Sequence, residues 1–404
     1  MTSKPHSESA AKRAGALYCE VDAEPLERYR KGGYHPTHLG DIFKDGRYKI
    51  IHKLGWGGYA TVWLARDFLL SRHVAIKILV SELWHDSHEV RILEHLLHGP
   101  ASHPGKKRII QLLDRFEHEG PNGTHPCLVF EPLGPSVVSE AELYTSNRLP
   151  GKVAWEASRQ TIQALAYIHA SGIAHGDLHP GNIIFANTTS YQSDTDLLKS
   201  LGEPQMSDVI PSSGHSLTAQ VPKYLVLPTS PPFVARDFES CQVKLVDFGE
   251  AFSVGQQRQI RCPLVFRAPE AFLTSQWDLQ VDIWSLGCTI FELVVGYPPF
   301  DNFMPNKDDL IREWVSMFGD LPEEWREGLP SPRATEDLES ERVTLRDWLH
   351  ETYFDDDRKQ DFSRADIDSL GTLLQSVMQY YPSDRPRASD LLNHTWFQRN
   401  PFTA

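Results

Sequence analysis

The chain has 404 residues, of which 40% are hydrophobic and 23% are charged. These values are ordinary for a globular protein, so they exclude a disordered or collagen-like chain and predict a sizeable core. Asp and Glu number 54 against 40 Lys and Arg, for a formal net charge of −14. An acidic surface argues against nucleic acid as a direct partner and favours basic partners. At about 150 residues per domain, the length predicts two or three compact units.

The five cysteines are scattered and include no CxxC pair. This arrangement favours a reducing compartment over a disulfide framework or a zinc site. No apolar run reaches 18 residues, so we expect no membrane span, and the polar N-terminus lacks the apolar segment of a secretory signal. We therefore expect an intracellular monomer, in the cytoplasm, the nucleus or both.

The N-terminal half begins with residues 1–45, which we interpret as an extension without a core of its own. From residue 48 the pattern changes. Residues 48–51 and 61–65 are predicted strands on either side of a glycine turn, and 74–80 is a third strand. Residues 87–97 have the apolar spacing of a helix. A buried strand is predicted at 127–130, followed by Pro and Gly residues that suggest a hinge.

The C-terminal half opens with a long amphipathic helix predicted over 153–169. Two short apolar runs follow, at 182–185 and 243–246. The stretch between them, about 187–240, is rich in Ser, Thr, Pro and Gly. It is too long for an ordinary loop, so we interpret it as a mobile insertion whose deletion the protein would tolerate. Beyond residue 268 the chain is predicted to be mostly helical.

Two motifs of the N-terminal half suggest phosphate chemistry. Glycines in Gly55-Trp-Gly-Gly58 would let the backbone approach a phosphate, although a hairpin that binds nothing has the same pattern. Lys77 ends the strand Val74-Ala-Ile-Lys77, and Glu89 lies on the next helix. A Lys–Glu pair there would direct the ammonium group toward the α- and β-phosphates of a nucleotide. The alternative is two unrelated surface charges, which contribute little.

Three further motifs follow in the C-terminal half. His175-Gly-Asp177-Leu-His-Pro-Gly-Asn182 places a carboxylate and an amide where one loop could present a general base and a metal ligand. Asp247-Phe-Gly249 could supply a Mg²⁺ ligand, although the tripeptide alone is compatible with a simple turn. Ala268-Pro-Glu270 and the run 282–287 complete the set, and alone they would be a loop and a core helix.

In this order and spacing the five motifs resemble the eukaryotic protein kinase family over about residues 48–397. The resemblance implies an α+β, two-lobed protein-kinase fold with ATP in the cleft. Its N-lobe would be a small antiparallel sheet over 48–131, and its C-lobe would be helical over 132–397. It also implies that Arg385 pairs with Glu270.

The resemblance assigns roles to individual residues. Asp177 would accept the proton of the substrate hydroxyl, Lys77 positioned by Glu89 would bind the ATP phosphates, and Asn182 and Asp247 would hold Mg²⁺. The residues implied to contact the nucleotide are Leu54, Gly55, Trp56, Gly57, Gly58, Tyr59, Ala60, Thr61, Val62, Ala75, Lys77, Glu131 and Leu133.

A narrower resemblance is to the SR-protein kinases. It is carried by residues 34–43 (YHPTHLGDIF), by 54–57 with 61–64 (LGWG and TVWL), and by 127–134 (CLVFEPLG). The insertion lies where that subfamily carries its spacer. The resemblance implies a serine/threonine kinase that phosphorylates Ser in basic, Arg/Ser-rich splicing factors and so regulates mRNA splicing. The acidic net charge is compatible with such substrates.

The chain departs from the family at three positions. Gly176 replaces an arginine, His179 replaces a lysine that steadies the γ-phosphate, and Pro263 stands where many relatives have threonine. These departures favour a catalytically weak scaffold. The opposing observation is that the chain retains Lys77, Asp177, Asn182 and Asp247. A third alternative is a small-molecule kinase, because the loop over 175–182 also resembles that of aminoglycoside and choline phosphotransferases.

The segment 247–270 is predicted to work without phosphorylation. Ser253 is its only hydroxyl residue, and Gly176 removes the arginine that would receive a phosphate. We expect packing to hold this segment, through Phe252, Leu264 and Phe266.

Overall fold

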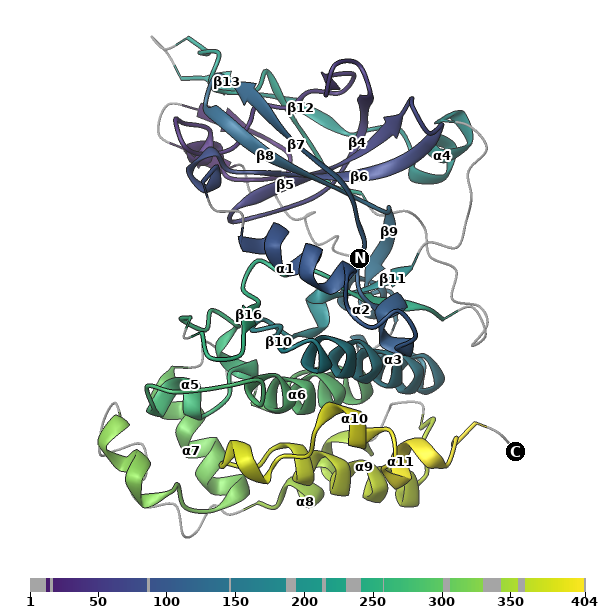
Figure 1. The fold of residues 1–404 in the computed structure, drawn as a ribbon, viewed down its shortest axis with the longest axis vertical. Coiled ribbons are helices and arrows are strands. Elements are labelled where there is room, and N and C mark those ends of the chain that lie inside the picture. The colour runs from purple at the N-terminus through teal and green to yellow at the C-terminus, as the bar shows by residue number, and fades with distance from the viewer. Residues whose placement is uncertain are drawn as a thin grey trace, which may run out of the picture. The chain divides into compact units, whose positions relative to one another are not determined.

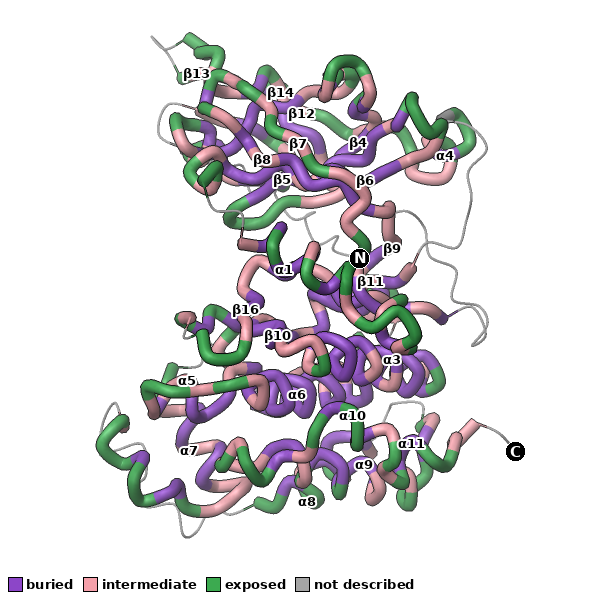
Figure 2. Tube along the Cα trace, viewed as in Figure 1, coloured by how far each residue is buried: buried purple, intermediate pink, exposed green. Residues whose placement is uncertain are grey.

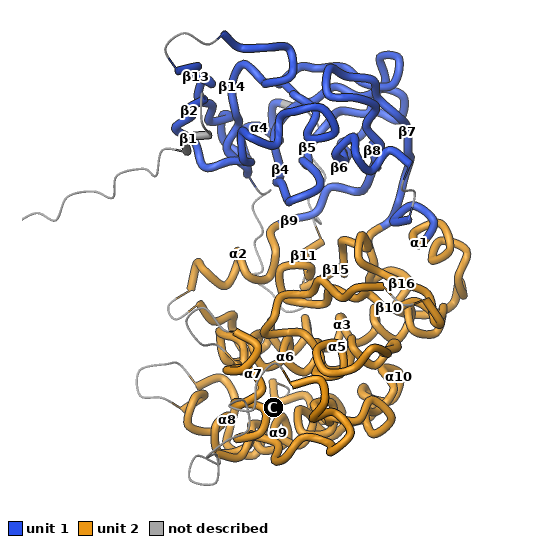
Figure 3. Tube along the Cα trace, turned by 90° about the vertical axis from the view of Figure 1, so that its left-hand side faces the viewer, with its two compact units in different colours: residues 1–91, 111–134, 187–232 blue, residues 92–110, 135–186, 233–404 orange. Residues whose placement is uncertain are grey.

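A computed structural model describes residues 12–14, 17–85, 88–144, 147–186, 194–212, 216–229, 241–256, 258–300, 306–329, 343–354 and 360–402 (Figure 1). The chain forms two compact units, each with buried residues along its strands or helices (Figure 2). Unit 1 comprises residues 1–91, 111–134 and 187–232, and unit 2 comprises 92–110, 135–186 and 233–404 (Figure 3).

Unit 1 is built on a six-stranded antiparallel sheet, in the order β3 (Ile42–Phe43), β4 (Tyr48–Gly57), β5 (Ala60–Asp67), β6 (Arg72–Leu79), β8 (Gly123–Phe130) and β7 (Leu112–Gly120). The strands predicted at 48–51, 61–65, 74–80 and 127–130 correspond to β4, β5, β6 and β8, and most of them are longer than predicted.

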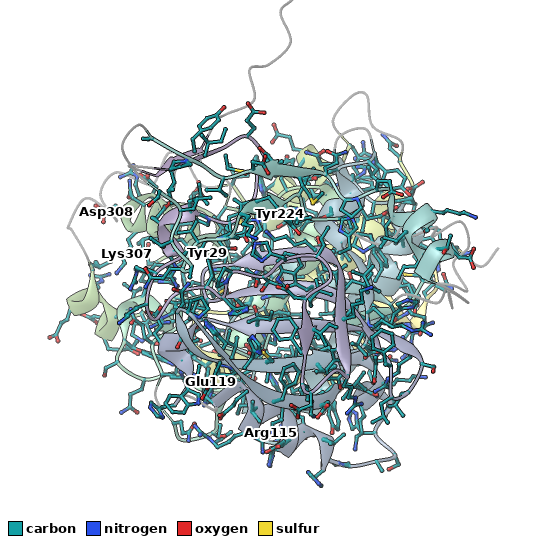
Figure 4. The ribbon with its side chains drawn as sticks, turned by 90° about the horizontal axis from the view of Figure 1, so that it is seen from above. Tyr29, Arg115, Glu119, Tyr224, Lys307 and Asp308 are labelled. Atoms are coloured by element: carbon teal, nitrogen blue, oxygen red, sulfur yellow. The ribbon has the colours of Figure 1, made fainter. Side chains whose placement is uncertain are left out.

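Strand β7 escaped prediction because it is an edge strand with a polar sequence. Its burial alternates between intermediate and exposed residues along most of its length. Arg115 and Glu119, labelled in Figure 4, are exposed. Charged residues of this kind are common on edge strands, where they discourage pairing with another chain.

The core of unit 1 is formed mainly by apolar side chains from the central strands. One residue from the predicted insertion, Val226, belongs to the same cluster. The buried members are Phe43, Tyr48, Ile50, Trp63, Ala65, Val74, Ile76, Ile78, Cys127, Val129 and Val226.

The N-terminal segment and the insertion share a second core, so two of our interpretations are wrong. Strands β1 (Lys12–Ala14) and β2 (Leu17–Cys19) pair with each other, and β2 also pairs with β13 (Ile210–Pro211) of the insertion. Strands β12 (Met206–Asp208) and β14 (Tyr224–Val226) pair as well. Residues 17–34 therefore do not lack a core, and 206–212 and 216–226 are not a mobile insertion. The buried residues of this second core are Cys19, Ala23, Leu26, Tyr29, Tyr34, Val80, Val209 and Leu225.

A buried ion pair ties the N-terminal segment to the sheet. Lys53 of β4 donates to the carboxylate of Glu24, and both side chains are almost completely buried. The hydroxyl of Tyr29 donates to the same carboxylate. A buried charge without a partner is costly, so this pair specifies where residues 24–29 lie. The rest of the insertion includes α4 (Asp194–Leu201), whose Leu197 is buried.

Unit 2 is mainly helical, as predicted for residues beyond 268. Nearly every residue of α6 (Val281–Val295) is buried, as is most of α3 (Gly151–Ala170), the helix predicted at 153–169. A helix that is apolar on all sides forms the centre of its domain. The other helices are α1 (His88–Leu97), which begins in unit 1, α2 (Val137–Ala141), α5 (Glu270–Leu273), α7 (Lys307–Phe318), α8 (Leu345–Tyr353), α9 (Arg364–Val377), α10 (Ala388–Leu391) and α11 (Thr395–Gln398).

Four short strands of unit 2 carry the loops discussed below. Strand β10 (Ile173–Ala174) pairs with β16 (Phe252–Ser253), and β11 (Ile183–Ala186) pairs with β15 (Val243–Leu245). Strand β9 (Leu133–Ser136) follows β8 after two residues.

The predicted pair of Arg385 and Glu270 is present. The two N–O distances are 2.6 and 2.7 Å, and both side chains are buried. Arg385 also donates to the carbonyl of Gln280 at 2.8 Å. Because removing one partner would leave a buried charge, breaking this pair should cost about 3–5 kcal/mol.

Leu225→Ala should lower the free energy of unfolding by about 2–5 kcal/mol, because Leu225 is 3% exposed in the second core. Ile210→Ala in β13 is the matched control, since Ile210 belongs to the same insertion but is 54% exposed and should cost far less. Urea denaturation of both variants measures the difference. Similar small losses would mean that the insertion does not stabilise the fold.

Candidate active site

The glycine turn predicted to approach phosphate is the tip of the β4–β5 hairpin. Gly57 pairs with Ala60, so Gly58 and Tyr59 form the turn. A Cβ atom added at Gly55, Gly57 or Gly58 would meet nothing within 4 Å, and none of these residues has a positive φ. Neither packing nor backbone conformation within the protein requires these glycines. The open space beside them is what a bound phosphate would need.

Lys77 and Glu89 form the predicted ion pair. The Nζ atom of Lys77 lies 2.8 and 2.9 Å from the two carboxylate oxygens of Glu89, in the first turn of α1. Lys77 lies on β6 between Val62 and Leu128 of the neighbouring strands. The two side chains are 16% and 10% exposed. The alternative of two unrelated surface charges is wrong, because both groups are largely removed from water and in contact.

The other predicted nucleotide-contacting residues lie along the same sheet. Residues 56–59 are exposed, Leu54, Gly55 and Val62 are partly buried, and Ala60, Thr61 and Ala75 are buried. Glu131 and Leu133 follow β8 and are partly buried. The carboxylate of Glu131 accepts from the backbone N–H of Gln111 at 3.3 Å.

In unit 2, the buried carboxylate of Asp282 holds the loop that contains Asp177. It accepts from the backbone N–H groups of His175 at 2.7 Å and Gly176 at 2.9 Å. It also lies 2.9 Å from Nε2 of His169. The ring of His175 lies 2.9 Å from the carbonyl of Val246. Neither Asp282 nor His175 was assigned a role from its sequence motif. A carboxylate at the start of an otherwise apolar helix was the available signal.

Strand register brings the predicted metal ligands to the same end of a strand pair. Asn182 directly precedes β11, Asp247 follows β15 by two residues, and Ile183 pairs with Leu245. The ladder continues with a 3.0 Å bond from the Val246 N–H to the Asn182 carbonyl. The side-chain amide of Asn182 donates to the backbone carbonyl of Asp177 at 2.9 Å and to its carboxylate at 3.2 Å.

The turn at 247–249 exposes a carboxylate and buries an aromatic ring. Asp247 has φ +60°, a left-handed conformation that is uncommon for residues other than glycine, and its side chain is exposed. Phe248 is fully buried, with its ring 5.2 Å from that of His175. Backbone strain of this kind persists where the surroundings impose it and is common at functional sites.

Gly176 occupies a place that an arginine would not fit. Its φ is +75°, and an added Cβ would lie 2.6 Å from the carbonyl oxygen of Glu250. Glycine replaces the family's arginine at a position where the backbone of residue 250 lies too close for a side chain.

His179 has a defined tautomer. The N–H of Gly181 donates to Nδ1 at 3.1 Å, which assigns the ring proton to Nε2. Nε2 lies 3.8 Å from the carboxylate of Asp177. The imidazole can therefore donate one hydrogen bond on the Asp177 side of the loop. A Cβ at Gly181 would lie 2.7 Å from the ring, so this arrangement needs glycine there.

The segment 247–270 is held by both packing and hydrogen bonds. Phe252 and Phe266 are buried as predicted, whereas Leu264 is only partly buried. Arg258 donates to the carbonyl of Gly249 at 3.2 Å, and Arg267 donates to that of Cys262 at 2.6 and 3.0 Å. Neither arginine contact was predicted from the sequence.

One carboxylate near the start of this segment, that of Glu250, is partly buried. Burial raises the pKa of Glu250, and Arg261, whose guanidinium lies 3.4 Å from the carboxylate, lowers that pKa only in part.

Comparison with known proteins places these features in a family. The protein kinase domain model matches residues 48–208 and 234–397. Protein kinase dsk1 of Schizosaccharomyces pombe is 29% identical, over 93% of this chain and 85% of the relative. Serine/threonine-protein kinase SRPK of Physarum polycephalum is 29% identical, over 96% and 94%. Human SRSF protein kinase 3 is 24% identical, over 93% and 90%.

The chain belongs to the protein kinase family. The predicted α+β kinase fold, the enzyme class of serine/threonine protein kinase and the resemblance to SR-protein kinases are confirmed. Membership of this family implies the use of ATP and of protein substrates. Within the part of the chain that the structure describes, no helix is long and apolar enough to cross a membrane.

Gly176→Ala should destabilise the protein by more than the roughly 1–2 kcal/mol expected for a left-handed non-glycine residue, because its Cβ also meets Glu250. Gly172→Ala is the matched control, since Gly172 has φ +73° and open space around the added atom. Gly176→Arg should cost at least as much as alanine. Chemical unfolding measures all three variants, and equal losses at the two positions would contradict the close approach.

Proposed function

We propose that the chain is an ATP- and Mg²⁺-dependent kinase that phosphorylates serine in Arg/Ser-rich proteins of the splicing-factor type. The observation that carries the catalytic part is the hydrogen-bonded pair of Asp177 and Asn182 beside Asp247, on a loop held by Asp282. The ion pair of Lys77 and Glu89 supports it from unit 1. A scaffold that only binds partners has no chemical need for both sets of residues.

In this proposal Asp177 orients the substrate hydroxyl and accepts its proton, and Lys77 contacts the α- and β-phosphates. Asn182 and Asp247 hold Mg²⁺, since carboxylate and amide oxygens are the hard ligands that this ion prefers. When bound, Mg²⁺ neutralises negative charge on the phosphates. Asn182 suits this role because its amide nitrogen donates to Asp177, which leaves the amide oxygen for the ion.

In this proposal the Nε2–H group of His179 donates one hydrogen bond to the γ-phosphate, where the family's lysine would supply a positive charge. A hydrogen bond to a developing negative charge still favours the transition state, although less than a full positive charge does. We therefore propose that the departure at residue 179 lowers the rate without abolishing phosphotransfer.

A pocket of unit 2 supports basic substrates. It has a volume of about 270 Å³, and its walls include Glu142, Glu292 and the catalytic-loop residue Pro180, with apolar contributions from Val137 and Leu149. An arginine side chain combines an apolar stem with a cationic end, so apolar walls with two carboxylates match its chemistry. The name of the human relative, SRSF protein kinase 3, and the net charge of −14 point the same way. A role in splicing regulation inside the cell is part of the same proposal.

A phosphotransfer assay with ATP and Mg²⁺ tests the proposed function. We expect transfer to an Arg/Ser-repeat peptide, little to an acidic peptide and none to an aminoglycoside. Asp177→Asn should lower kcat by at least about 100-fold and change ATP affinity little, because the carboxylate acts on the hydroxyl proton. Lys77→Met should weaken productive ATP binding instead. ATP binding without transfer to any peptide would favour the scaffold, and transfer to the aminoglycoside would favour the small-molecule kinase.

Activity should not depend on phosphorylation of residues 247–270. Ser253, the only hydroxyl residue of this segment, pairs in strand register with Ile173. Gly176 offers no cation to receive a phosphate, and arginine contacts to carbonyls already hold the segment. Protein expressed in bacteria and treated with phosphatase should therefore keep its full rate. A several-fold gain after phosphorylation of Ser253 would contradict this expectation.

A further inference from the structure

Three successive carbonyl groups at the tip of the glycine hairpin accept hydrogen bonds from residues outside the hairpin. The hydroxyl of Tyr34 donates to the carbonyl of Gly57 at 2.7 Å. The guanidinium of Arg28 donates to that of Gly58, also at 2.7 Å. The backbone N–H of Val80 donates to that of Tyr59 at 2.9 Å. A tip that would otherwise be free to move is thus attached at each of its peptide groups.

These contacts also determine where the N–H groups of the tip point. A peptide unit is planar and trans, so its N–H points away from its C=O. Holding the carbonyls of Gly57 and Gly58 therefore directs the N–H groups of Gly58 and Tyr59 away from Tyr34 and Arg28. The space beside the same glycines is open, because added Cβ atoms at Gly57 and Gly58 would meet nothing within 4 Å.

Two aromatic rings and a carboxylate hold the Arg28 side chain in the position from which it bonds to the turn. Its guanidinium carbon lies 5.5 Å from the ring centre of Tyr34 and 5.9 Å from that of Tyr59, within the range of a cation–π contact. The same guanidinium lies 3.3 Å from the carboxylate of Glu82. Tyr34 is 1% exposed.

Arg28 and Tyr34 lie outside the part of the chain that matches the protein kinase domain model, which begins at residue 48. Tyr34 belongs to the second core, which the N-terminal segment shares with residues 209 and 225 of the insertion, and Arg28 lies in the same segment next to Tyr29 of that core. The buried pair of Glu24 and Lys53 attaches the same segment to β4, the strand that ends at the glycine turn. The contacts to the tip are therefore part of a packed structure.

We propose that Arg28 and Tyr34 are positioning residues for ATP: they hold the glycine turn so that its N–H groups face the phosphates before the nucleotide binds. The proposal rests on the proposed role of this turn in nucleotide binding. Ordering a free loop costs entropy when a ligand binds, and a turn that is already ordered avoids that cost. The loss of either contact should appear in ATP binding, since Asp177 and its neighbours are untouched.

Tyr34→Phe, which keeps the ring, and Arg28→Met, which removes the donors, test the proposal. We expect each to raise the KM for ATP about 3- to 10-fold, the effect of one lost hydrogen bond. The kcat and the KM for the Arg/Ser peptide should change less than about twofold. Arg28→Lys, which keeps a donor, should recover part of the loss. Amide hydrogen exchange over residues 56–60, measured without nucleotide, should become faster in Tyr34→Phe and Arg28→Met.

Two matched controls come from the same N-terminal segment. The hydroxyl of Tyr18 contacts only Glu20 among the contacts described, and Arg30 approaches Glu82 without reaching the glycine turn. Tyr18→Phe and Arg30→Met should leave the KM for ATP and the exchange of 56–60 unchanged.

The possible outcomes separate the proposal from its alternatives. Unchanged exchange over 56–60 together with an unchanged KM for ATP would overturn it. Equal losses in kcat and in both KM values, with a lower Tm, would indicate a purely structural role and would also overturn it. If the wild-type protein neither binds ATP nor transfers phosphate, the proposed function fails. The exchange measurement would then still show whether Arg28 and Tyr34 hold the turn.

Discussion

The geometry of the loop over residues 175–182 depends on one buried carboxylate, that of Asp282. It is 1% exposed, and it accepts from two consecutive backbone N–H groups and lies against the ring of His169. Hydrogen bonds to an ionised group are stronger than neutral ones, and a buried carboxylate without partners would be very costly. The first turn of α6 therefore fixes the backbone at residues 175 and 176. From there the loop places Asp177, and through it the amide of Asn182.

This constraint also gives a physical account of Gly176. With its N–H bound to Asp282, the residue adopts a left-handed conformation against the backbone of Glu250. The arginine found here in the family, which would receive an activating phosphate, does not fit at residue 176. Its Cβ would lie too close to the Glu250 carbonyl, in the segment that such a phosphate would regulate. In this structure Arg258 and Arg267 donate to backbone carbonyls of the same segment without a phosphate. The left-handed glycine at residue 176 and the close approach of the Glu250 backbone are two aspects of the same packing.

The sequence predicted what local patterns encode and missed what distant pairing creates. Apolar periodicity located β4, β5, β6, β8 and α3, motif order made a Lys77–Glu89 pair one of two interpretations, and the resemblance to protein kinases implied the Glu270–Arg385 pair. The strands of the insertion are two or three residues long and lie among Ser, Pro and Gly, so no period is visible. The partner of β13 is β2, almost 200 residues earlier in the chain. The N-terminal segment and the insertion form a core only together, so the sequence of either one alone does not predict it. The contacts of Arg28 and Tyr34 with the glycine turn depend on the same pairing.

Unit 1 thus joins three segments that the sequence presents as separate: an N-terminal segment, a kinase sheet and an insertion. The sheet carries the residues proposed to contact the nucleotide, while the other two segments carry no residue to which a catalytic or nucleotide-binding role is assigned. The N-terminal segment supplies hydrogen bonds that hold backbone groups of the glycine turn. Side-chain substitutions within the turn could not supply these bonds. Glycines that let a ligand approach have no side chains with which to fix their own conformation. A rigid glycine turn must therefore be held by residues from elsewhere, and here the second core of unit 1 brings Arg28 and Tyr34 to that position.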